Sequence, residues 1–209
     1  MTNVYYLILD ILVFALYAFL HSFLASLSVK NYLAQQLGNL MAFYRLFYNL
    51  LALWLLFYIY DSLPHPDIEL LELKFPWDVI ILVPQFLALA GIIWTLRYFS
   101  ASEFLGFSQI KRYFNKSFVL DSANEPSENL TLVIKGPYKV VRHPLYLFTI
   151  IFFLLRPTMD LFYLVFLIFL IAYFYIGSFY EEKKLVSAFG DTYLNYQKSV
   201  PRLFPFLIS

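Results

Sequence analysis

The sequence predicts an all-α, polytopic membrane protein. Hydrophobic residues make up 61% of its 209 residues and charged residues only 14%, whereas soluble domains carry about 25% charged residues. The mean hydropathy is +0.68. Several apolar stretches are long enough to cross a hydrocarbon core of about 30 Å. We therefore expect a single integral-membrane domain over residues 1–209, with about five transmembrane helices and a C-terminal amphipathic helix.

The first predicted span covers residues 4–24. It lacks the basic start and the small-residue cleavage site of a signal peptide, so we expect a retained helix. Asp10, Tyr17 and His21 share one helical face. Because polar groups in lipid are costly, this face is predicted to point into the bundle, and a packing role is favoured over a catalytic one.

Further spans are predicted at 42–60, 79–99, 145–155 and 161–180. The span at 145–155 is about 16 Å long as a helix, which is too short for an ordinary crossing. Residues 30–41 are expected to form a polar connector. After residue 180 the composition becomes soluble-like, and an apolar stripe predicts an amphipathic helix on the membrane surface, formed by Leu185, Phe189, Tyr193 and Tyr196.

The distribution of charge predicts the orientation. Lys and Arg concentrate in the first and third connections and in the tail, whereas the second connection is acidic. By the positive-inside rule, the N-terminus lies outside, and residues 100–142 and 181–209 lie in the cytosol.

The composition argues against several classes of function. The net charge is +1 and no basic stripe is present, so nucleic acid is not an expected partner. The absence of cysteine excludes disulfides, thiolate metal sites and a cysteine nucleophile. His21, His65 and His143 do not have the spacing of metal ligands, so no metal is expected.

The candidate site lies in two segments of the last third of the chain, residues 135–148 and 178–205. The first reads Lys-Gly-Pro-Tyr-Lys-Val-Val-Arg-His-Pro-Leu-Tyr up to Tyr146. The second contains Glu-Glu-x-x-Leu from Glu181, then Phe-Gly-x-x-Tyr-x-x-Tyr, and Val-Pro-Arg ending at Arg202. This order of motifs resembles the integral-membrane methyltransferases of the isoprenylcysteine carboxyl methyltransferase and phospholipid methyltransferase superfamily.

Shorter segments look closest to the methanethiol S-methyltransferase and NnrU-like branch of that superfamily. They are His21-Ser-Phe-Leu-Ala25, Phe104-Leu-Gly-Phe-Ser-Gln109 and Pro157-Thr-Met159. The branch implies the same methyl donor as the rest of the superfamily, and it suggests a small thiol as the methyl acceptor.

The resemblance implies a site for S-adenosylmethionine (AdoMet). A carboxylate suits the ammonium of this donor, arginine and histidine suit its carboxylate or ribose, and aromatic faces favour its sulfonium. The predicted cofactor-binding residues are Gly136, Tyr138, Arg142, His143, Pro144, Tyr146, Glu181 and Glu182. The predicted catalytic residues are His143, Tyr146 and Arg202.

These residues also have purely structural interpretations. Glu181 and Glu182 would suit the dipole of a helix that begins there, without any ligand. Tyr193 and Tyr196 are more often anchors at the membrane interface than site residues.

Two positions depart from the family pattern. Phe148 stands where the family usually has glycine, and Phe179 stands where relatives often carry arginine. These departures leave the identity of the methyl acceptor open. Phe148 affects the space beside the methyl donor, and Phe179 takes the place of a cation near the donor.

The function expected from these observations is AdoMet-dependent S-methylation of a small thiol such as methanethiol, which gives dimethyl sulfide. A thiol needs little help from a base, since its thiolate is the nucleophile. Carboxyl O-methylation of prenylated cysteine or another lipophilic acid is the alternative enzymatic function. A non-catalytic, NnrU-like membrane protein is the alternative from a different class. The expected partners are the lipid bilayer and a small or lipophilic methyl acceptor.

Overall fold

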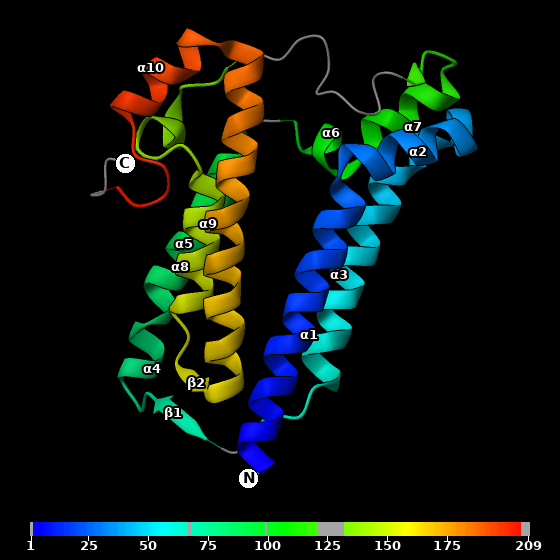
Figure 1. Ribbon diagram of the computed structural model, residues 1–209. Helices are drawn as coiled ribbons and strands as arrows, with labels where there is room; N and C mark the ends of the chain where they lie inside the picture. The colour runs from blue at the N-terminus through cyan, green and yellow to red at the C-terminus, as the bar shows by residue number, and fades with distance from the viewer. Residues whose placement is uncertain (1, 67, 99, 121–131, 206–209) are drawn as a thin grey trace. The chain divides into compact units, whose positions relative to one another are not determined.

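A computed structural model describes residues 2–66, 68–98, 100–120 and 132–205. The chain divides into two compact units (Figure 1). Unit 1 contains residues 1–8, 65–99 and 132–209, and unit 2 contains residues 9–64 and 100–131.

Helices dominate the described residues, which confirms the all-α class. Among the described residues, four helical segments are long and apolar enough to cross a membrane: Val4–Ala25, Leu27–Ser62, Trp77–Leu96 and Leu161–Phe189. The remaining predicted span is the short apolar helix α8, Pro144–Leu154, with 11 residues. Phe99, the last residue of the third predicted span, lies outside the described residues.

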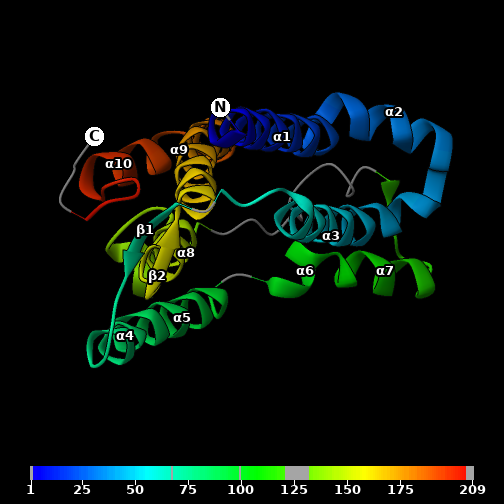
Figure 2. The same ribbon diagram turned by 90° about the horizontal axis from the view of Figure 1, so that it is seen from below.

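In unit 1, α8 lies between α5 (Leu82–Leu96) and α9 (Leu161–Phe189) (Figures 1 and 2). The short helix α4 (Trp77–Ile80) leads into α5. Helices α5 and α8 approach closely at Gly91, where an added Cβ would lie 2.5 Å from the ring of Phe148. The outer surface of α5 is apolar: Val83, Phe86 and Leu87 are 61%, 64% and 66% exposed. Such a surface suits contact with lipid.

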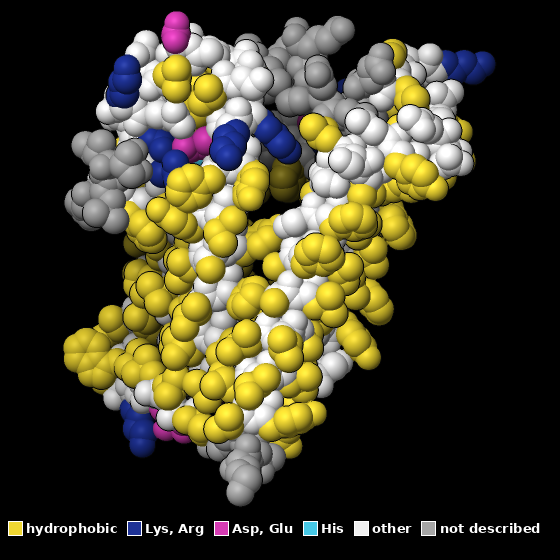
Figure 3. All heavy atoms as spheres, viewed as in Figure 1, with side chains coloured by type: hydrophobic (Ala, Val, Ile, Leu, Met, Phe, Trp, Pro, Cys, Tyr) yellow, Lys and Arg dark blue, Asp and Glu magenta, His cyan; other side chains and the backbone are white. Residues whose placement is uncertain are grey.

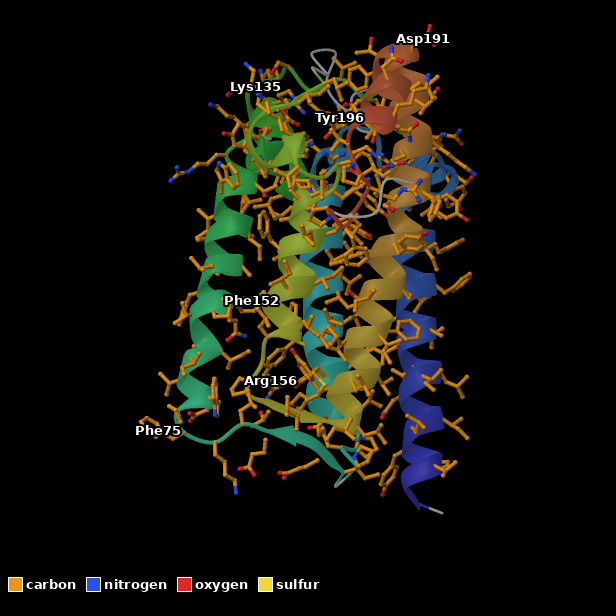
Figure 4. The ribbon with its side chains drawn as sticks, turned by 90° about the vertical axis from the view of Figure 1, so that its left-hand side faces the viewer. Phe75, Lys135, Phe152, Arg156, Asp191 and Tyr196 are labelled. Atoms are coloured by element: carbon orange, nitrogen blue, oxygen red, sulfur yellow. The ribbon has the colours of Figure 1, made fainter. Side chains whose placement is uncertain are left out.

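A two-stranded antiparallel pair joins β1 (Glu69–Glu72) to β2 (Thr158–Asp160), with Leu71 opposite Met159. Both strands lie in connections between the predicted spans, where the sequence indicated no strand. The pair lies at the end of unit 1 that carries Phe75 and Arg156, opposite the end that carries Lys135 and Asp191 (Figure 4). Charged side chains gather near both ends, whereas hydrophobic side chains cover the length of the helices between them (Figure 3).

Helix α9 continues through residue 180 to Phe189, nine residues beyond the predicted end of that span. Gly190, with φ +54°, ends it, and α10 follows over Asp191–Ser199. Glu181 and Glu182 therefore lie inside a helix, and the interpretation that they begin one is wrong. The C-terminal amphipathic helix is α10.

The four residues of the predicted apolar stripe lie in one cluster, but the single amphipathic helix expected to carry them is wrong, because Leu185 and Phe189 belong to α9 and Tyr193 and Tyr196 to α10. Tyr193 and Tyr196 are buried beside Val200, and they pack against residues of α9 and of the segment before α8, namely Leu185, Val186, Phe189, Leu132 and Ile134. With exposed fractions of 1% and 4%, the two tyrosines are core residues of unit 1, so the expectation of exposed interface anchors is wrong.

Unit 2 contains most of α1 (Thr2–Ala25), together with α2 (Leu27–Leu37), η1 (Gly38–Phe43), α3 (Tyr44–Ser62), α6 (Ala101–Leu105) and α7 (Phe107–Phe114). The polar connector at 30–41 is helical and lies in α2 and η1, and Ser26 caps α2 by accepting from the Val29 amide. The polar face of α1 packs inward as predicted. Asp10 is fully buried, and the Tyr17 hydroxyl donates to the carbonyl of Ala52 on α3 at 3.1 Å.

Candidate functional site

The site lies in unit 1, at the end where α10 packs. Arg142 and His143 directly precede α8, whose first turn begins with Pro144. The amides of Arg142 and His143 donate to the carbonyls of Pro201 at 2.9 Å and Arg202 at 3.0 Å. The chain after α10 therefore runs beside the start of α8, and this places Arg202 next to the Arg-His motif.

Glu182 is the centre of the site's hydrogen bonds. Its Oε1 accepts from Arg142 Nε at 2.7 Å and lies 3.1 Å from His143 Nε2. Its Oε2 accepts from Arg142 Nη2 at 3.1 Å, from Gln197 Nε2 at 2.8 Å and from Arg202 Nη2 at 3.1 Å. The side chain is only 3% exposed. Bonds to an ionised carboxylate are strong, so Glu182 holds α8, α9 and the tail together.

Arg142 is equally well satisfied. Its side chain is 1% exposed, and its Nη1 donates to the carbonyls of Gln197 and Val200. A buried guanidinium requires this full set of acceptors, because removing a charge from water is costly. Arg142 therefore links Glu182 of α9 to the end of α10.

Glu181 has different surroundings, since its side chain is 48% exposed. It accepts from the Tyr146 hydroxyl at 2.9 Å, and His143 Nδ1 lies 3.4 Å from its Oε2. The Tyr146 ring stacks between His143, at 5.3 Å and 7°, and Phe174, at 4.5 Å and 6°. An accessible carboxylate thus lies beside a fixed aromatic stack.

His143 lies between the two carboxylates. Burial by itself would lower the pKa of His143, but hydrogen bonds and charges from Glu181 and Glu182 outweigh it and raise the pKa above its ordinary value. Both ring nitrogens face a carboxylate oxygen, so the geometry favours the imidazolium, in which both nitrogens donate.

Gly136 and Tyr138 lie in the turn η3 (Gly136–Lys139) that precedes this cluster. Gly136 has φ +56°, and an added Cβ would collide with the ring of Tyr98, so only glycine fits. The Tyr138 carbonyl accepts from the Tyr196 hydroxyl. Burial and the nearby charge of Glu181 raise the pKa of Tyr138 to about 12, which keeps its hydroxyl neutral.

The two departures from the family pattern each have a packing partner. Phe148 lies against Gly91 of α5, so its ring fills the space that this glycine leaves. Phe179 lies under the guanidinium of Arg202, with the Cζ atom 3.6 Å from the ring centroid. The tail therefore supplies an arginine next to the position where relatives often carry one.

The structure brings together the predicted residues Arg142, His143, Tyr146, Glu181, Glu182 and Arg202. Pro144 starts α8 beside them, and Gly136 and Tyr138 form the adjoining turn. Sequence reasoning missed Gln197. No motif singles out this residue, and its bond to Glu182 depends on how α10 packs against α9.

Comparison with known proteins shows relatives of one kind. The chain is 30% identical over 209 residues to methanethiol S-methyltransferase 1 of Bradyrhizobium diazoefficiens, covering 95% of the chain and 66% of that protein. It is 46% identical over 70 residues to methanethiol S-methyltransferase of Pseudomonas deceptionensis (34% of the chain, 27% of that protein). It is 35% identical over 107 residues to methanethiol S-methyltransferase of Crocosphaera subtropica (50% of the chain, 38% of that protein).

These alignments cover less than two thirds of the length of the curated relatives. No family model matches the chain, and no solved structure is significantly similar to it. The full-length similarity and the assembled motifs nevertheless agree. The chain is similar along 95% of its length to a methanethiol S-methyltransferase, in agreement with the resemblance of its motifs to that branch of the integral-membrane methyltransferases.

Proposed function

We propose that this protein is an AdoMet-dependent membrane methyltransferase that methylates the sulfur of a small thiol, such as methanethiol, to give dimethyl sulfide. The observation that carries the proposal is the convergence of the Arg-His-Pro-x-Tyr and Glu-Glu motifs around one accessible carboxylate, Glu181. The relatives named methanethiol S-methyltransferase support the thiol as acceptor.

The residues of the site fit AdoMet by their chemistry. Glu181 offers an accessible carboxylate to an ammonium. The stacked rings of Tyr146 and Phe174 offer aromatic faces, which attract a cationic sulfur. Arg202 uses Nε and Nη2 to bind Glu182, and we assign its Nη1 to the carboxylate of the donor. When bound, AdoMet supplies a methyl group attached to a positively charged sulfur.

We assign Arg142 and Glu182 a positioning role, because each already has a full set of hydrogen-bond partners. They fix the start of α8 relative to α9, and thereby the distance between Tyr146 and Glu181. Such orientation matters, since methyl transfer needs the reacting atoms about 3–3.5 Å apart and in line.

In this proposal, His143 binds Glu181 through Nδ1 and Glu182 through Nε2. An imidazolium has no lone pair to accept a proton, so the form favoured here does not act as the base. The nucleophile is the thiolate of the acceptor, and its proton is released to solvent.

We propose that the donor site and the C-terminus lie in the cytosol, with the N-terminus outside. The excess of Lys and Arg in residues 100–142 and in the tail supports this orientation. It also places the site in the compartment that supplies AdoMet.

Headspace detection of dimethyl sulfide tests the proposal. Cells that express the full chain are fed methanethiol, with Glu181→Gln as the site variant and Glu72→Gln, an exposed glutamate on β1, as the matched control. We expect dimethyl sulfide from the wild type and the control but not from Glu181→Gln. If the folded protein binds AdoMet and makes no dimethyl sulfide, the acceptor is a lipophilic carboxylate instead. If it does not bind AdoMet, the protein is non-catalytic.

A further inference from the structure

Unit 2 contains a pocket that methyl transfer in unit 1 does not use. Its cavity volume is about 210 Å³, and residues of α2, η1, α3, α6 and α7 line it. Two of the branch-specific segments meet here. Phe104 and Gln109 line the pocket, and His21 lies against its wall, with its ring 2.8 Å from the hydroxyl of Tyr48.

Close packing of the α6–α7 junction against α3 builds one wall. Gly106 joins the two helices with φ +103°, and an added Cβ would meet the backbone of α3 at 2.6 Å. Arg45 Nη1 donates to the Glu103 carbonyl at 2.8 Å, and Asn49 Nδ2 donates to the Phe104 carbonyl at 3.0 Å. The guanidinium of Arg45 is thereby held at the pocket.

The charge of the pocket is positive. Among the described residues that line it, the charged side chains are Lys30 and Arg45. The neighbouring acid, Glu103, is neutralised by Arg112, with Nη1–Oε1 at 2.6 Å and Nη2–Oε2 at 3.1 Å. The hydrogen bond from Arg112 lowers the pKa of Glu103, against the opposing effect of burial. Because Arg112 pairs with Glu103, the carboxylate offsets the charge of Arg45 only in part.

Gln109 adds an acceptor that lacks a donor. Its Nε2 donates to the carbonyl of Glu103 at 3.2 Å and to its carboxylate at 3.1 Å, which fixes the orientation of the amide. The side chain is 4% exposed, and Oε1 has no hydrogen-bond partner in the part of the chain that the structure describes. A buried acceptor without a donor is unfavourable, so this oxygen suits a ligand with a hydroxyl group.

We propose that this pocket binds the headgroup of an anionic phospholipid, with its phosphate on Lys30 and Arg45 and a headgroup hydroxyl on Gln109 Oε1. Arginine matches the geometry of phosphate, and basic pockets at transmembrane helices bind anionic headgroups. The volume is below the roughly 300 Å³ of ordinary small-molecule sites, so it suits a headgroup rather than a large ligand. Phosphatidylglycerol supplies both the net negative charge and the hydroxyl groups.

The test measures lipid selectivity of the full chain. The protein is reconstituted in nanodiscs of equal phosphatidylglycerol and phosphatidylcholine, re-extracted, and its retained lipids are quantified by mass spectrometry. The variants are Lys30→Gln and Arg45→Gln, and the matched control is Lys111→Gln, an exposed cation on α7. We expect phosphatidylglycerol to be enriched on the wild type and on Lys111→Gln. Each pocket variant should lower the enrichment by about fivefold, the effect of one cation near an anionic lipid.

Two results would overturn the proposal. One is the absence of enrichment on the wild type, and the other is an equal loss in Lys111→Gln, which would indicate general surface attraction. Because Arg45 also donates to the Glu103 carbonyl, Lys30→Gln decides the outcome if Arg45→Gln unfolds, and Lys30→Arg should restore the enrichment.

A competition arm distinguishes a lipid from a soluble phosphate. We expect sn-glycerol 3-phosphate and inorganic phosphate, added in excess, to leave the retained phosphatidylglycerol unchanged. Displacement by either would reassign the pocket to a soluble phosphate compound and contradict the lipid.

Discussion

Arg142 and Glu182 form a buried, bidentate ion pair across 40 residues of chain, with Nε–Oε1 at 2.7 Å and Nη2–Oε2 at 3.1 Å. The next residue along α9, Glu181, has a side chain that is 48% exposed. Successive residues on a helix point about 100° apart, so the two adjacent glutamates face different surroundings. Glu182 fixes the positions of the residues around it, and Glu181 is available to a ligand.

The two glutamates should therefore differ in their effect on stability. Glu182→Ala leaves the guanidinium of Arg142 buried and unpaired, and we expect a loss of about 3–5 kcal/mol in the free energy of unfolding. Glu181→Ala should cost less, about 1 kcal/mol, because its half-exposed side chain loses the hydrogen bond from Tyr146. Denaturant unfolding of the full chain in detergent measures both values. Equal losses would contradict the distinction between the two residues.

Tyr146→Phe isolates one hydrogen bond of the site. The variant loses the bond to Glu181 but keeps the ring between His143 and Phe174. Since one net hydrogen bond contributes about 1 kcal/mol, we expect AdoMet affinity to fall about fivefold. Tyr180→Phe, at an exposed position of α9, is the matched control. Unchanged affinity in Tyr146→Phe would remove this hydroxyl from the donor site.

Stability should depend on pH through His143. The pKa of His143 is raised in the folded protein. Its contribution to the free energy of unfolding is therefore fully present below the pKa of the unfolded state, about 6.5, and is lost as the pH rises through the pKa of the folded state. The melting temperature of the wild type should fall over this interval relative to that of His143→Gln. Parallel curves for the two proteins would show that the imidazolium does not stabilise the fold.

The contact between Gly91 and Phe148 should be sensitive to one added methyl group. In Gly91→Ala the new Cβ would meet the ring of Phe148 at 2.5 Å, and overpacking of this kind costs about 1–3 kcal/mol. The double variant Gly91→Ala/Phe148→Leu should be more stable than the sum of the two single changes predicts. Strict additivity in thermal unfolding would argue against direct contact between these positions.

Motif spacing identified the Arg-His and Glu-Glu segments, and their assembly was predictable because the predicted spans at 145–155 and 161–180 run between them and return the chain to the same side. The difference between Glu181 and Glu182 was not predictable, since it depends on the rotation of α9 relative to α8. The end of α9 was also misplaced. The change of composition near residue 180 marks where polar residues begin, whereas the helix ends at Gly190, which adopts a positive φ. The pairing of β1 with β2 depends on contacts between distant segments that no local pattern reveals.

The most direct test of the donor site is calorimetric titration of AdoMet into the purified full chain, its Glu181→Gln variant and the Glu72→Gln control. A hydrogen bond to a charged group contributes about 1.5–3 kcal/mol, so Glu181→Gln should weaken binding by about tenfold or more. Glu72→Gln should bind as the wild type does. Equal affinity in all three proteins would contradict the assignment of Glu181 to the ammonium of the donor.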